Sequence, residues 1–180
     1  MANHVYIATS LDGYIARRNH SLDWLDELSN PENDDFGYAS FMLGIDALVM
    51  GRNTFDKILS FNEWPFNKPV FIVSNSLKNI PTDLQGKAKI INGTVTEMLD
   101  EIHQSGYKEL YIDGGQTIST FLAEDKIDEM TITRVPRLLG DGIRLFDFIG
   151  IDLQFEHVET ISYSNGLIKS YYKRLRKGSA

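Results

Sequence analysis

The stretch from Asp46 to Phe55 places side chains that can bind an anion directly after a buried strand. Residues 47–50 are apolar and partly β-branched, which is typical of a strand covered on both faces of a parallel sheet. Gly51 then allows a ligand to approach the backbone, and Thr54 can cap a following helix. Helix-start N–H groups beside the Arg52 guanidinium predict a phosphate site. Taken alone, the stretch is equally compatible with an ordinary strand-to-helix turn and a solvated arginine.

Three other predicted strands also end in short polar or glycine-rich groups, at residues 10–13 (SLDG), 74–76 (SNS) and 113–115 (DGG). Ligands of α/β sheets bind outside the carboxyl ends of the strands, so these groups are expected to meet. Gly114 and Gly115 come just before a predicted helix and permit backbone contact with a pyrophosphate. Two helix-start anion sites and a hydroxyl-rich strand end favour an extended dinucleotide over a single phosphate. The chain has neither the G-x-G-x-x-G fingerprint of Rossmann folds nor a Walker P-loop.

The elements that must position these groups alternate between strands and helices. Short apolar runs predict strands over residues 4–9, 47–50, 70–73, 89–91, 110–112 and 130–135. Helical spacing and capping residues predict helices over about 30–43, 55–59, 94–105 and 116–123. Two final strands, at 153–161 and 167–175, are joined by a turn at 164–166. We therefore expect one α/β domain over 1–176 with a frayed tail at 177–180. Its sheet should be mixed and mainly parallel, flanked by helices on both faces, with a C-terminal antiparallel hairpin.

Composition restricts the classes of function. The chain has 180 residues and a net charge of −7, which argues against a nucleic-acid or anionic-membrane partner, because those surfaces require clustered positive charge. Cysteine is absent, so disulfides, thiolate metal sites and cysteine catalysis are excluded. The 4 histidines are scattered without metal-ligand spacing, and no metal is expected. No apolar run approaches the length of a membrane span and no leader-like segment precedes the first strand, so we expect a cytoplasmic protein.

Four motifs resemble, in type and order, those of the dihydrofolate reductase-like family. They are residues 8–16 (ATSLDGYIA), 49–55 (VMGRNTF), 111–115 (YIDGG) and 138–142 (LLGDG). The pattern resembles in particular a small bacterial branch that shares its fold with the C-terminal reductase domain of the bifunctional riboflavin-synthesis deaminase-reductase. Motif order and strand pattern match from about residue 4 to 175. The resemblance implies a dihydrofolate reductase-like fold and an NADPH-dependent reductase.

The resemblance also implies a set of cofactor residues at the strand ends. Arg52 would contact the adenosine 2′-phosphate of NADPH and Thr54 the pyrophosphate. Gly114 and Gly115 match the pyrophosphate turn, and the peptide between them is a candidate for the cis form. Many relatives have arginine where this chain has Asn75, which weakens the expected selectivity for the 2′-phosphate. The implied set is Ala8, Ile15 and Ala16 beside the nicotinamide, and Gly51, Arg52, Asn53, Thr54, Ser74, Asn75, Ser76, Gly114, Gly115, Gln116 and Thr117 around the rest of the cofactor.

The substrate end is expected to contain an acid, because hydride transfer to a C=N or C=O bond needs a proton source. The resemblance implies Asp35 as the acid that binds the substrate ring, with Thr133 supporting it and Asp34 as a rival. In the riboflavin branch the aspartate of the Ser-Leu-Asp-Gly motif, here Asp12, faces the substrate. Purely structural roles stay open, because acids favour a helix's first turn and Asp-Gly favours a turn. The implied substrate-binding residues are Tyr6, Phe36 and Trp24, the last in a loop over the site.

One departure argues against folate as the substrate. The folate enzymes clamp a carboxylate tail with an arginine after the central strand's helix, whereas residues 61–66 here contain Glu63 and no basic residue. We therefore expect a reductase of a small heterocyclic substrate, either dihydrofolate- or pterin-like or pyrimidine-like. The alternatives are a pyrimidine reductase of riboflavin-biosynthesis type, another small carbonyl or imine reductase, and a non-catalytic NADP(H)-binding module. Relatives in the family are often dimers, so a homodimer is expected.

Overall fold

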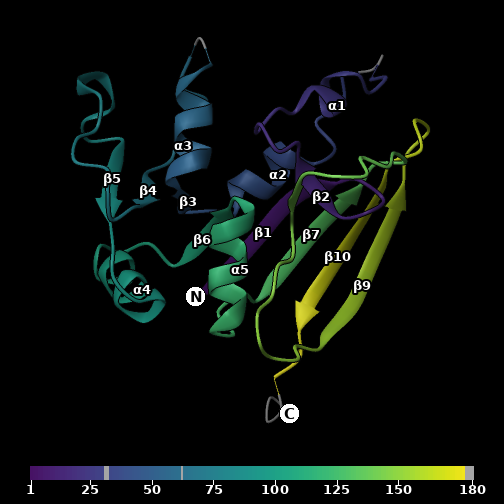
Figure 1. The fold of residues 1–180 in the computed structure, drawn as a ribbon. Helices are drawn as coiled ribbons and strands as arrows, with labels where there is room; N and C mark the ends of the chain where they lie inside the picture. The colour runs from purple at the N-terminus through teal and green to yellow at the C-terminus, as the bar shows by residue number, and fades with distance from the viewer. Residues whose placement is uncertain (31–32, 62, 177–180) are drawn as a thin grey trace.

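The computed structural model describes residues 1–30, 33–61 and 63–176. Its centre is an eight-stranded sheet in the order β5-β4-β3-β6-β1-β7-β10-β9 (Figure 1). The strands are β1 (Ala2–Thr9), β3 (Ala47–Gly51), β4 (Val70–Val73), β5 (Ala88–Ile91), β6 (Glu109–Asp113), β7 (Glu129–Arg134), β9 (Phe155–Ser162) and β10 (Ile168–Arg174). The six strands from β5 to β7 are parallel, whereas β10 and β9 pair antiparallel. This mixed, mainly parallel sheet with a terminal hairpin confirms the predicted fold class.

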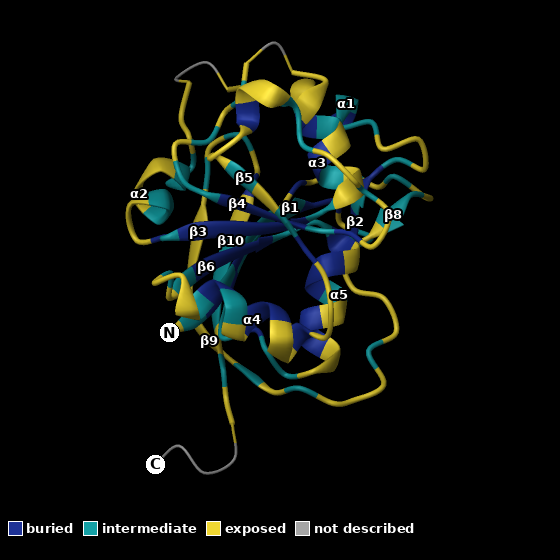
Figure 2. Ribbon diagram, turned by 90° about the vertical axis from the view of Figure 1, so that its left-hand side faces the viewer, coloured by how far each residue is buried: buried dark blue, intermediate teal, exposed yellow. Residues whose placement is uncertain are grey.

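Helices cover both faces of the parallel part of the sheet. The helices are α1 (Asp23–Asp26), α2 (Tyr38–Leu43), α3 (Arg52–Leu59), α4 (Val95–Gln104) and α5 (Gly115–Ala123), with a 3₁₀ turn at Thr82–Leu84. On one face α4 and α5 pack against Val49 and Ile112, and on the other α2 and α3 pack against Leu48 and Met50. Strand β3 is therefore buried on both faces, as its continuous apolar run predicts (Figure 2). Within the described residues, no helix is long and apolar enough to cross a membrane.

A separate two-stranded ribbon lies beside the main sheet and consists of β2 (Tyr14–Ala16) and β8 (Ile143–Arg144). Gly142 allows this pairing, because a Cβ atom built there would collide with the carbonyl oxygen of Ala16. The ribbon also approaches the start of α5, where a Cβ on Gly115 would lie 2.8 Å from both the Arg144 carbonyl oxygen and Ile15 Cδ1. Strands this short have no detectable periodicity, and their pairing follows from tertiary packing.

The helix predicted over about 30–43 is much shorter in the structure. It begins only at Tyr38, after Gly37 with a φ of 90°. The side chain of Asn30 accepts a hydrogen bond from Asp34 N at 3.0 Å and donates one to the Asp34 carbonyl at 2.9 Å, which closes a turn. The side chains of Asp34 and Asp35 also accept hydrogen bonds from backbone N–H groups of this segment. These side-chain bonds replace the backbone hydrogen bonds of the predicted helix. Pro31, expected at the first helical position, and the tail at 177–180 lie outside the described residues.

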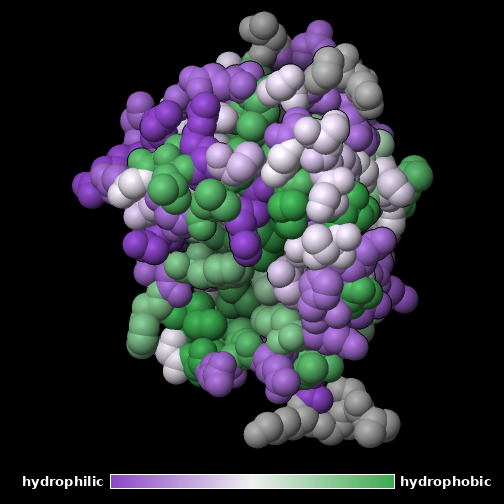
Figure 3. Space-filling view, turned by 90° about the vertical axis from the view of Figure 1, so that its right-hand side faces the viewer, coloured by the Kyte–Doolittle hydropathy of each residue, from purple (hydrophilic) through white to green (hydrophobic). Residues whose placement is uncertain are grey.

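The C-terminal hairpin is covered less well than the rest of the sheet. Apart from Phe155, every residue of β9 is exposed, and β9 forms one edge of the sheet. In Figure 1, α3, α4 and α5 lie to the left of the hairpin, and no helix is drawn across β9 and β10. Figure 3 shows hydrophobic side chains gathered around a hollow on this side of the molecule.

Candidate functional site

A cavity of about 1060 Å³ opens at the carboxyl ends of the central parallel strands. Its walls come from the ends of β1, β3, β4 and β6, the first turns of α3 and α5, and ribbon β2–β8. The residues predicted from sequence that line it are Tyr6, Ala8, Ile15, Ala16, Gly51, Arg52, Asn53, Thr54, Ser74, Asn75, Gly114, Gly115, Gln116 and Thr117. The expectation that the strand ends meet is correct for the groups after β3, β4 and β6, because neighbouring parallel strands end at the same edge of the sheet, whereas none of residues 10–13, after β1, lines the cavity.

The two glycine turns are in close contact with each other. A Cβ on Gly51 would lie 2.9 Å from Thr117 Oγ1, and a Cβ on Gly114 would collide with Thr54 Oγ1. Gly114 also has a φ of 88°, a conformation that side-chain-bearing residues rarely adopt. Each glycine thus leaves room for the threonine of the other turn, and together they form one continuous backbone surface. The peptide between Gly114 and Gly115 is trans, since no cis bond occurs in the described residues, so the candidate cis form is not seen.

Two helices begin on this surface without any side-chain cap. The N-cap residues are Gly51 for α3 and Gly114 for α5, and as glycines they provide no side-chain cap for the first N–H groups of either helix. By contrast, α4, which does not reach the cavity, has a complete capping box between Thr94 and Glu97. The first N–H groups of a helix have no intrahelical partner and carry partial positive charge. The first turns of α3 and α5 are therefore suited to bind oxygen atoms of one pyrophosphate.

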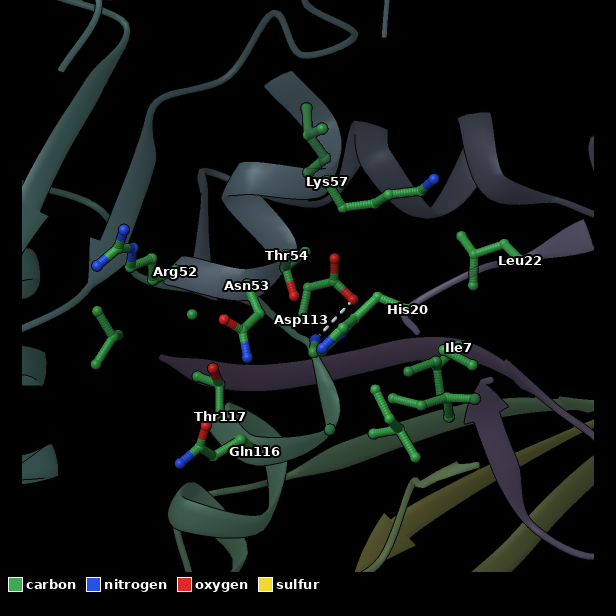
Figure 4. Close-up of a pocket in the computed structure, with 18 of the residues that line it drawn as sticks. Ile7, His20, Leu22, Arg52, Asn53, Thr54, Lys57, Asp113, Gln116 and Thr117 are labelled. Atoms are coloured by element: carbon green, nitrogen blue, oxygen red, sulfur yellow. Dashed lines mark hydrogen bonds between the residues drawn. The ribbon is translucent and has the colours of Figure 1, made fainter. Parts of the chain in front are cut away.

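One end of the cavity carries the predicted arginine. Arg52 donates from Nε to Asp56 at 3.2 Å and from Nη1 to Ser76 Oγ at 2.9 Å. Ser76 does not line the cavity itself, but it fixes the guanidinium between the ends of β3 and β4. Ser74 Oγ accepts hydrogen bonds from the backbone N–H groups of Ser76 and Leu77, and these bonds shape the turn after β4. The guanidinium and this hydroxyl-rich turn make one end of the cavity suitable for an anionic group (Figure 4).

The floor of the cavity contains an acid to which the sequence analysis gave no role. Burial raises the pKa of Asp113, while a hydrogen bond from Gly114 N at 2.8 Å to Oδ1 opposes the shift. Tyr38 and Tyr111 line the cavity nearby, and Tyr111 donates to the Tyr6 carbonyl at 2.8 Å. The sequence feature that could have identified Asp113 as a cavity residue is its position. It is the last residue of a buried parallel strand, directly before the glycine pair. A carboxyl in this environment retains its proton to higher pH than an exposed aspartate.

The other end of the cavity is more apolar, and the sequence analysis did not predict most of its lining residues. Figure 4 shows Ile7, Leu22 and His20 on the side of Asp113 opposite to Arg52. Further unpredicted lining residues are Arg18, Leu25, Lys57, Ile58, Phe61, Pro65, Phe66, Val73, Thr120 and Ile143. Several come from loops and from the side of α3, where no sequence pattern indicates which residues face a cavity.

Asp12 holds two loops together and does not line the cavity. Its carboxylate accepts three hydrogen bonds. They come from Ser10 Oγ at 2.5 Å, Leu139 N at 3.1 Å and Gly140 N at 2.7 Å. The hydrogen bond from Ser10, with those from the two backbone groups, lowers the pKa of Asp12 to about 2. The Asp12 side chain thus joins the first sequence motif, residues 8–16, to the fourth, residues 138–142. This is a structural role, which the sequence analysis kept as the alternative to substrate binding.

Asp35 and Trp24 also lie away from the cavity. Asp35 accepts hydrogen bonds from Gly37 N and Ala39 N, both at 2.8 Å, at the exposed start of α2. Trp24 is 0% exposed and packs against Val135 and Leu167, because the loop that carries it folds onto a separate small core.

Thr133 and Phe36 occupy structural positions. Thr133 is buried beside Ala8 across the β1–β7 pair, one strand away from the cavity. The Phe36 carbonyl accepts hydrogen bonds from Tyr6 at 2.7 Å, from Tyr163 at 3.2 Å and from Lys169 at 2.5 Å, while its ring packs edge-on against Tyr163. Of the expected substrate-binding set, the structure brings only Tyr6 to the cavity. No group of His, Asp or Glu within the described residues is arranged to hold a metal ion.

Comparison with known proteins gives relatives that match most of the chain. The Bacillus subtilis protein YwjB is 34% identical over 146 residues, covering 79% of this chain and 80% of its own. A structure from Shewanella sp. PV-4, whose name links it to riboflavin biosynthesis, is 46% identical, with a TM-score of 0.94 over 98% of this chain and 100% of its own. Dihydrofolate reductase from Enterococcus faecalis has the same fold, with a TM-score of 0.66 at 16% identity over 97% of both chains. The RibD C-terminal domain family matches residues 4–169, and the chain belongs to that family.

Proposed function

We propose that this protein is an NADPH-dependent reductase of a small heterocyclic substrate. The observation that carries the proposal is the pair of uncapped helix starts, α3 and α5, which meet through interlocking glycine turns at one edge of a large cavity. A single helix start is common, but two that face one cavity match the two phosphates of a dinucleotide. Family membership and the dihydrofolate reductase fold agree with a reductase.

The proposed binding mode uses the whole length of the cavity. Arg52, held by Ser76, would bind the 2′-phosphate at the adenosine end. Backbone N–H groups after Gly51 and Gly114 would bind the pyrophosphate, and the two threonine hydroxyls at these turns add donors. The apolar wall formed by Ala8, Ile15 and Ala16 would pack against the nicotinamide and exclude water there. When bound, NADPH supplies the hydride, which the protein itself cannot provide.

In the proposed reaction, the protein donates a proton to the substrate and holds the donating carboxyl in a fixed orientation. Asp113 lies between the two ends of the cavity, and its raised pKa allows the carboxyl to hold a proton nearer to neutral pH. Its Oδ1 atom accepts Gly114 N–H, which fixes the carboxyl, so the other oxygen is the one suited to donate to a substrate nitrogen or oxygen. Burial raises the pKa of Tyr6 to about 12, so the hydroxyl that donates to the Phe36 carbonyl keeps its proton.

The apolar end of the cavity supports a planar heterocycle as substrate. Ile7, Leu22 and Phe66 provide surfaces against which a pterin-like or pyrimidine-like ring can pack, while Asp113 supplies a polar partner. The absence of an arginine in residues 61–66 favours a substrate other than dihydrofolate. A riboflavin-type pyrimidine reductase therefore remains the main alternative, and a non-catalytic NADP(H)-binding module is the second.

The first test is a thermal-shift measurement with NADPH, with NADH and without ligand. Ligand at 100-fold above its Kd adds about 2.7 kcal/mol of stability, which raises the Tm of a domain of this size by several degrees. We expect a larger shift with NADPH than with NADH. Turnover is then measured as NADPH oxidation in the presence of dihydrofolate, dihydropterin and aminopyrimidine substrates. NADPH binding without turnover on any of them would support the non-catalytic module, and no shift with either nucleotide would refute the proposal.

Arg52→Ala tests the adenosine end, with Arg137→Ala as the matched control. Arg137 lies outside the cavity and is paired with Glu27 at 2.6 Å, so both variants remove one arginine that has an acidic partner. Loss of a charge-assisted contact is worth roughly 1.5–3 kcal/mol, so Arg52→Ala should raise the Kd for NADPH about tenfold or more. The Kd for NADH should not change in either variant. Equal effects on both nucleotides would show that Arg52 is not the 2′-phosphate ligand.

A further inference from the structure

The chain contains two Asn-Gly pairs, Asn92-Gly93 and Asn165-Gly166. In such a pair the backbone nitrogen of the glycine can attack the side-chain amide of the asparagine, because no glycine side chain obstructs the approach. The attack requires a glycine N–H that is not held by an acceptor and an asparagine amide that can turn toward it. The two pairs have the same residues, so their surroundings in the fold decide which of them can react.

The first pair has neither of these restraints. Asn92 and Gly93 are both exposed and lie between the end of β5 and the capping box that starts α4. Within the described residues, no acceptor takes a hydrogen bond from the Gly93 N–H, and the Asn92 side-chain amide has no hydrogen-bond partner. The hydrogen bonds of the capping box begin one residue later, where Thr94 N donates to Glu97 at 2.8 Å. The attacking nitrogen and the amide of this pair can therefore meet.

The second pair is held at both reacting groups. Gly166 N donates to the Tyr163 carbonyl at 2.9 Å, so the attacking nitrogen is committed to the turn between β9 and β10. The Asn165 amide is anchored at both ends, because Nδ2 donates to the Ser29 carbonyl at 3.0 Å and Oδ1 accepts Leu167 N at 3.4 Å. This turn must open before the pair can react. The second pair is therefore an internal control for the first.

We propose that Asn92 is a site of spontaneous deamidation in the folded protein and that Asn165 is protected. The Gly93 nitrogen gives up its proton to solvent and bonds to Cγ of Asn92. The bond between Cγ and Nδ2 breaks, and ammonia leaves with a proton taken from solvent. Water then opens the cyclic imide at either carbonyl group, which produces aspartate or isoaspartate at position 92. The net reaction consumes water and releases ammonia, so it needs no oxidant, reductant or enzyme, and it does not depend on the proposed function.

The test is peptide mapping of the full chain during incubation at about pH 8. Trypsin cleaves after lysine and arginine, and its peptides 90–108 and 145–169 contain one asparagine each, Asn92 and Asn165 respectively. Mass spectrometry therefore follows the two pairs separately. In the folded protein we expect Asn92 to deamidate at least about tenfold faster, because Asn165 reacts only after its hydrogen bonds open. In the chain unfolded by urea the two rates should agree within about threefold, because neither pair is then held.

Three outcomes of this experiment would overturn the proposal. Equal rates in the folded protein would show that the hydrogen bonds of Asn165 give no protection. A folded protein in which Asn92 stays intact while the unfolded chain reacts would show that the fold protects the first pair also. A difference that persists unchanged in urea would assign it to the flanking sequence. Asn92→Ser is the control variant, and its intact mass should stay constant over the same period.

The reaction product would lie at the edge of the sheet that carries the cofactor cavity. Strands β4 and β5 are parallel, and Ser74 N donates to the Ile91 carbonyl at 3.1 Å. Position 92 therefore follows directly beside the turn at 74–76, whose last residue holds the Arg52 guanidinium. Deamidation adds a negative charge at this edge, and such a charge opposes the binding of another anion there.

A binding measurement tests this consequence, which rests on the proposed function. Asn92→Asp should raise the Kd for NADPH about two- to threefold at low ionic strength and less at high salt, because exposed charges are screened. Asn92→Ser should keep the native Kd at both salt concentrations. An unchanged Kd in Asn92→Asp would separate the modification from the cofactor site. A native protein that binds no NADPH would instead refute the proposed function, and peptide mapping would still decide whether Asn92 deamidates.

Discussion

At the residue scale, two aspartates of this chain have opposite roles. Asp113 is half-buried in the cavity wall, and its burial raises its pKa. Asp35 is exposed, accepts two backbone N–H groups at the start of α2, and has a lowered pKa for that reason. An acid that catalyses is held at a cost to stability, whereas an acid that caps a helix start stabilises the fold. We therefore propose Asp113 as the proton source of the proposed reductase and expect Asp35 to contribute to folding.

Asn substitutions at these two positions should have opposite effects on stability at pH 7. The folded-state pKa of Asp113 lies above 3.8, so its carboxyl destabilises the native state once the pH rises above that value. Asp113→Asn should therefore raise Tm at pH 7, with the gain disappearing below about pH 4. Asp35 has a lowered pKa, so its stabilising effect exists above 3.8 and Asp35→Asn should lower Tm at pH 7.

Turnover by the same two variants separates catalysis from folding. Asp113→Asn should lower kcat by about a hundredfold, the lower range of general acid catalysis, with little effect on the Kd for NADPH. Asp35→Asn should keep the native kcat because its side chain lies outside the cavity. Differential scanning fluorimetry from pH 3 to 8 and NADPH-oxidation kinetics provide both readouts. A large loss of kcat in Asp35→Asn alone would return the acid role to that residue.

At the element scale, the important feature is that α3 and α5 begin at neighbouring strand ends. Strands β3 and β6 are parallel and hydrogen-bonded to each other, so the helices that follow them start side by side. The two helices then diverge to opposite faces of the sheet, since α5 belongs to one core cluster and α3 to the other. Only their first turns remain together. This arrangement explains why both turns require glycine and why neither helix has a side-chain cap.

Gly114→Ala tests the glycine turn, with Gly86→Ala as its control. Both glycines have similar positive φ values, 88° and 81°, but a Cβ on Gly86 meets nothing within 4 Å while one on Gly114 meets Thr54 Oγ1. The shared backbone strain costs about 1–3 kcal/mol, so both variants should be destabilised. Gly114→Ala should lose additional stability and bind NADPH at least tenfold more weakly. Chemical denaturation and NADPH titration measure the two effects, and unchanged NADPH affinity would remove the turn from the cofactor site.

At the scale of the whole molecule, the cavity and the C-terminal hairpin lie at different parts of the sheet. The cavity lies at the carboxyl ends of the central parallel strands, and the hairpin forms the antiparallel edge. Segment 143–153 connects the two regions, since Ile143 lines the cavity and Phe146 lines a second cavity against the hairpin. NADPH bound as proposed would therefore leave the hairpin uncovered.

Hydrogen exchange with and without NADPH should show this separation. Protection should increase in the first turns of α3 and α5 and in the turn after β4, because their N–H groups are the proposed phosphate and ribose contacts. Exchange in β9 and β10 should not change with NADPH, because no residue of these two strands lines the cavity. Protection by NADPH confined to the hairpin would contradict the placement of the cofactor.

The sequence by itself determined the α/β class, the buried strands, the closing hairpin and the strand-end groups that line the cavity. Those features follow from apolar runs, glycines and caps, which act over a few residues. Tertiary structure decided the rest. The helix expected from Asn30 onward was prevented by side-chain hydrogen bonds of Asp34 and Asp35, and Trp24 was enclosed by a small core built from distant residues. The role of Asp113 depends on burial, and burial is set by packing between elements that no local pattern records.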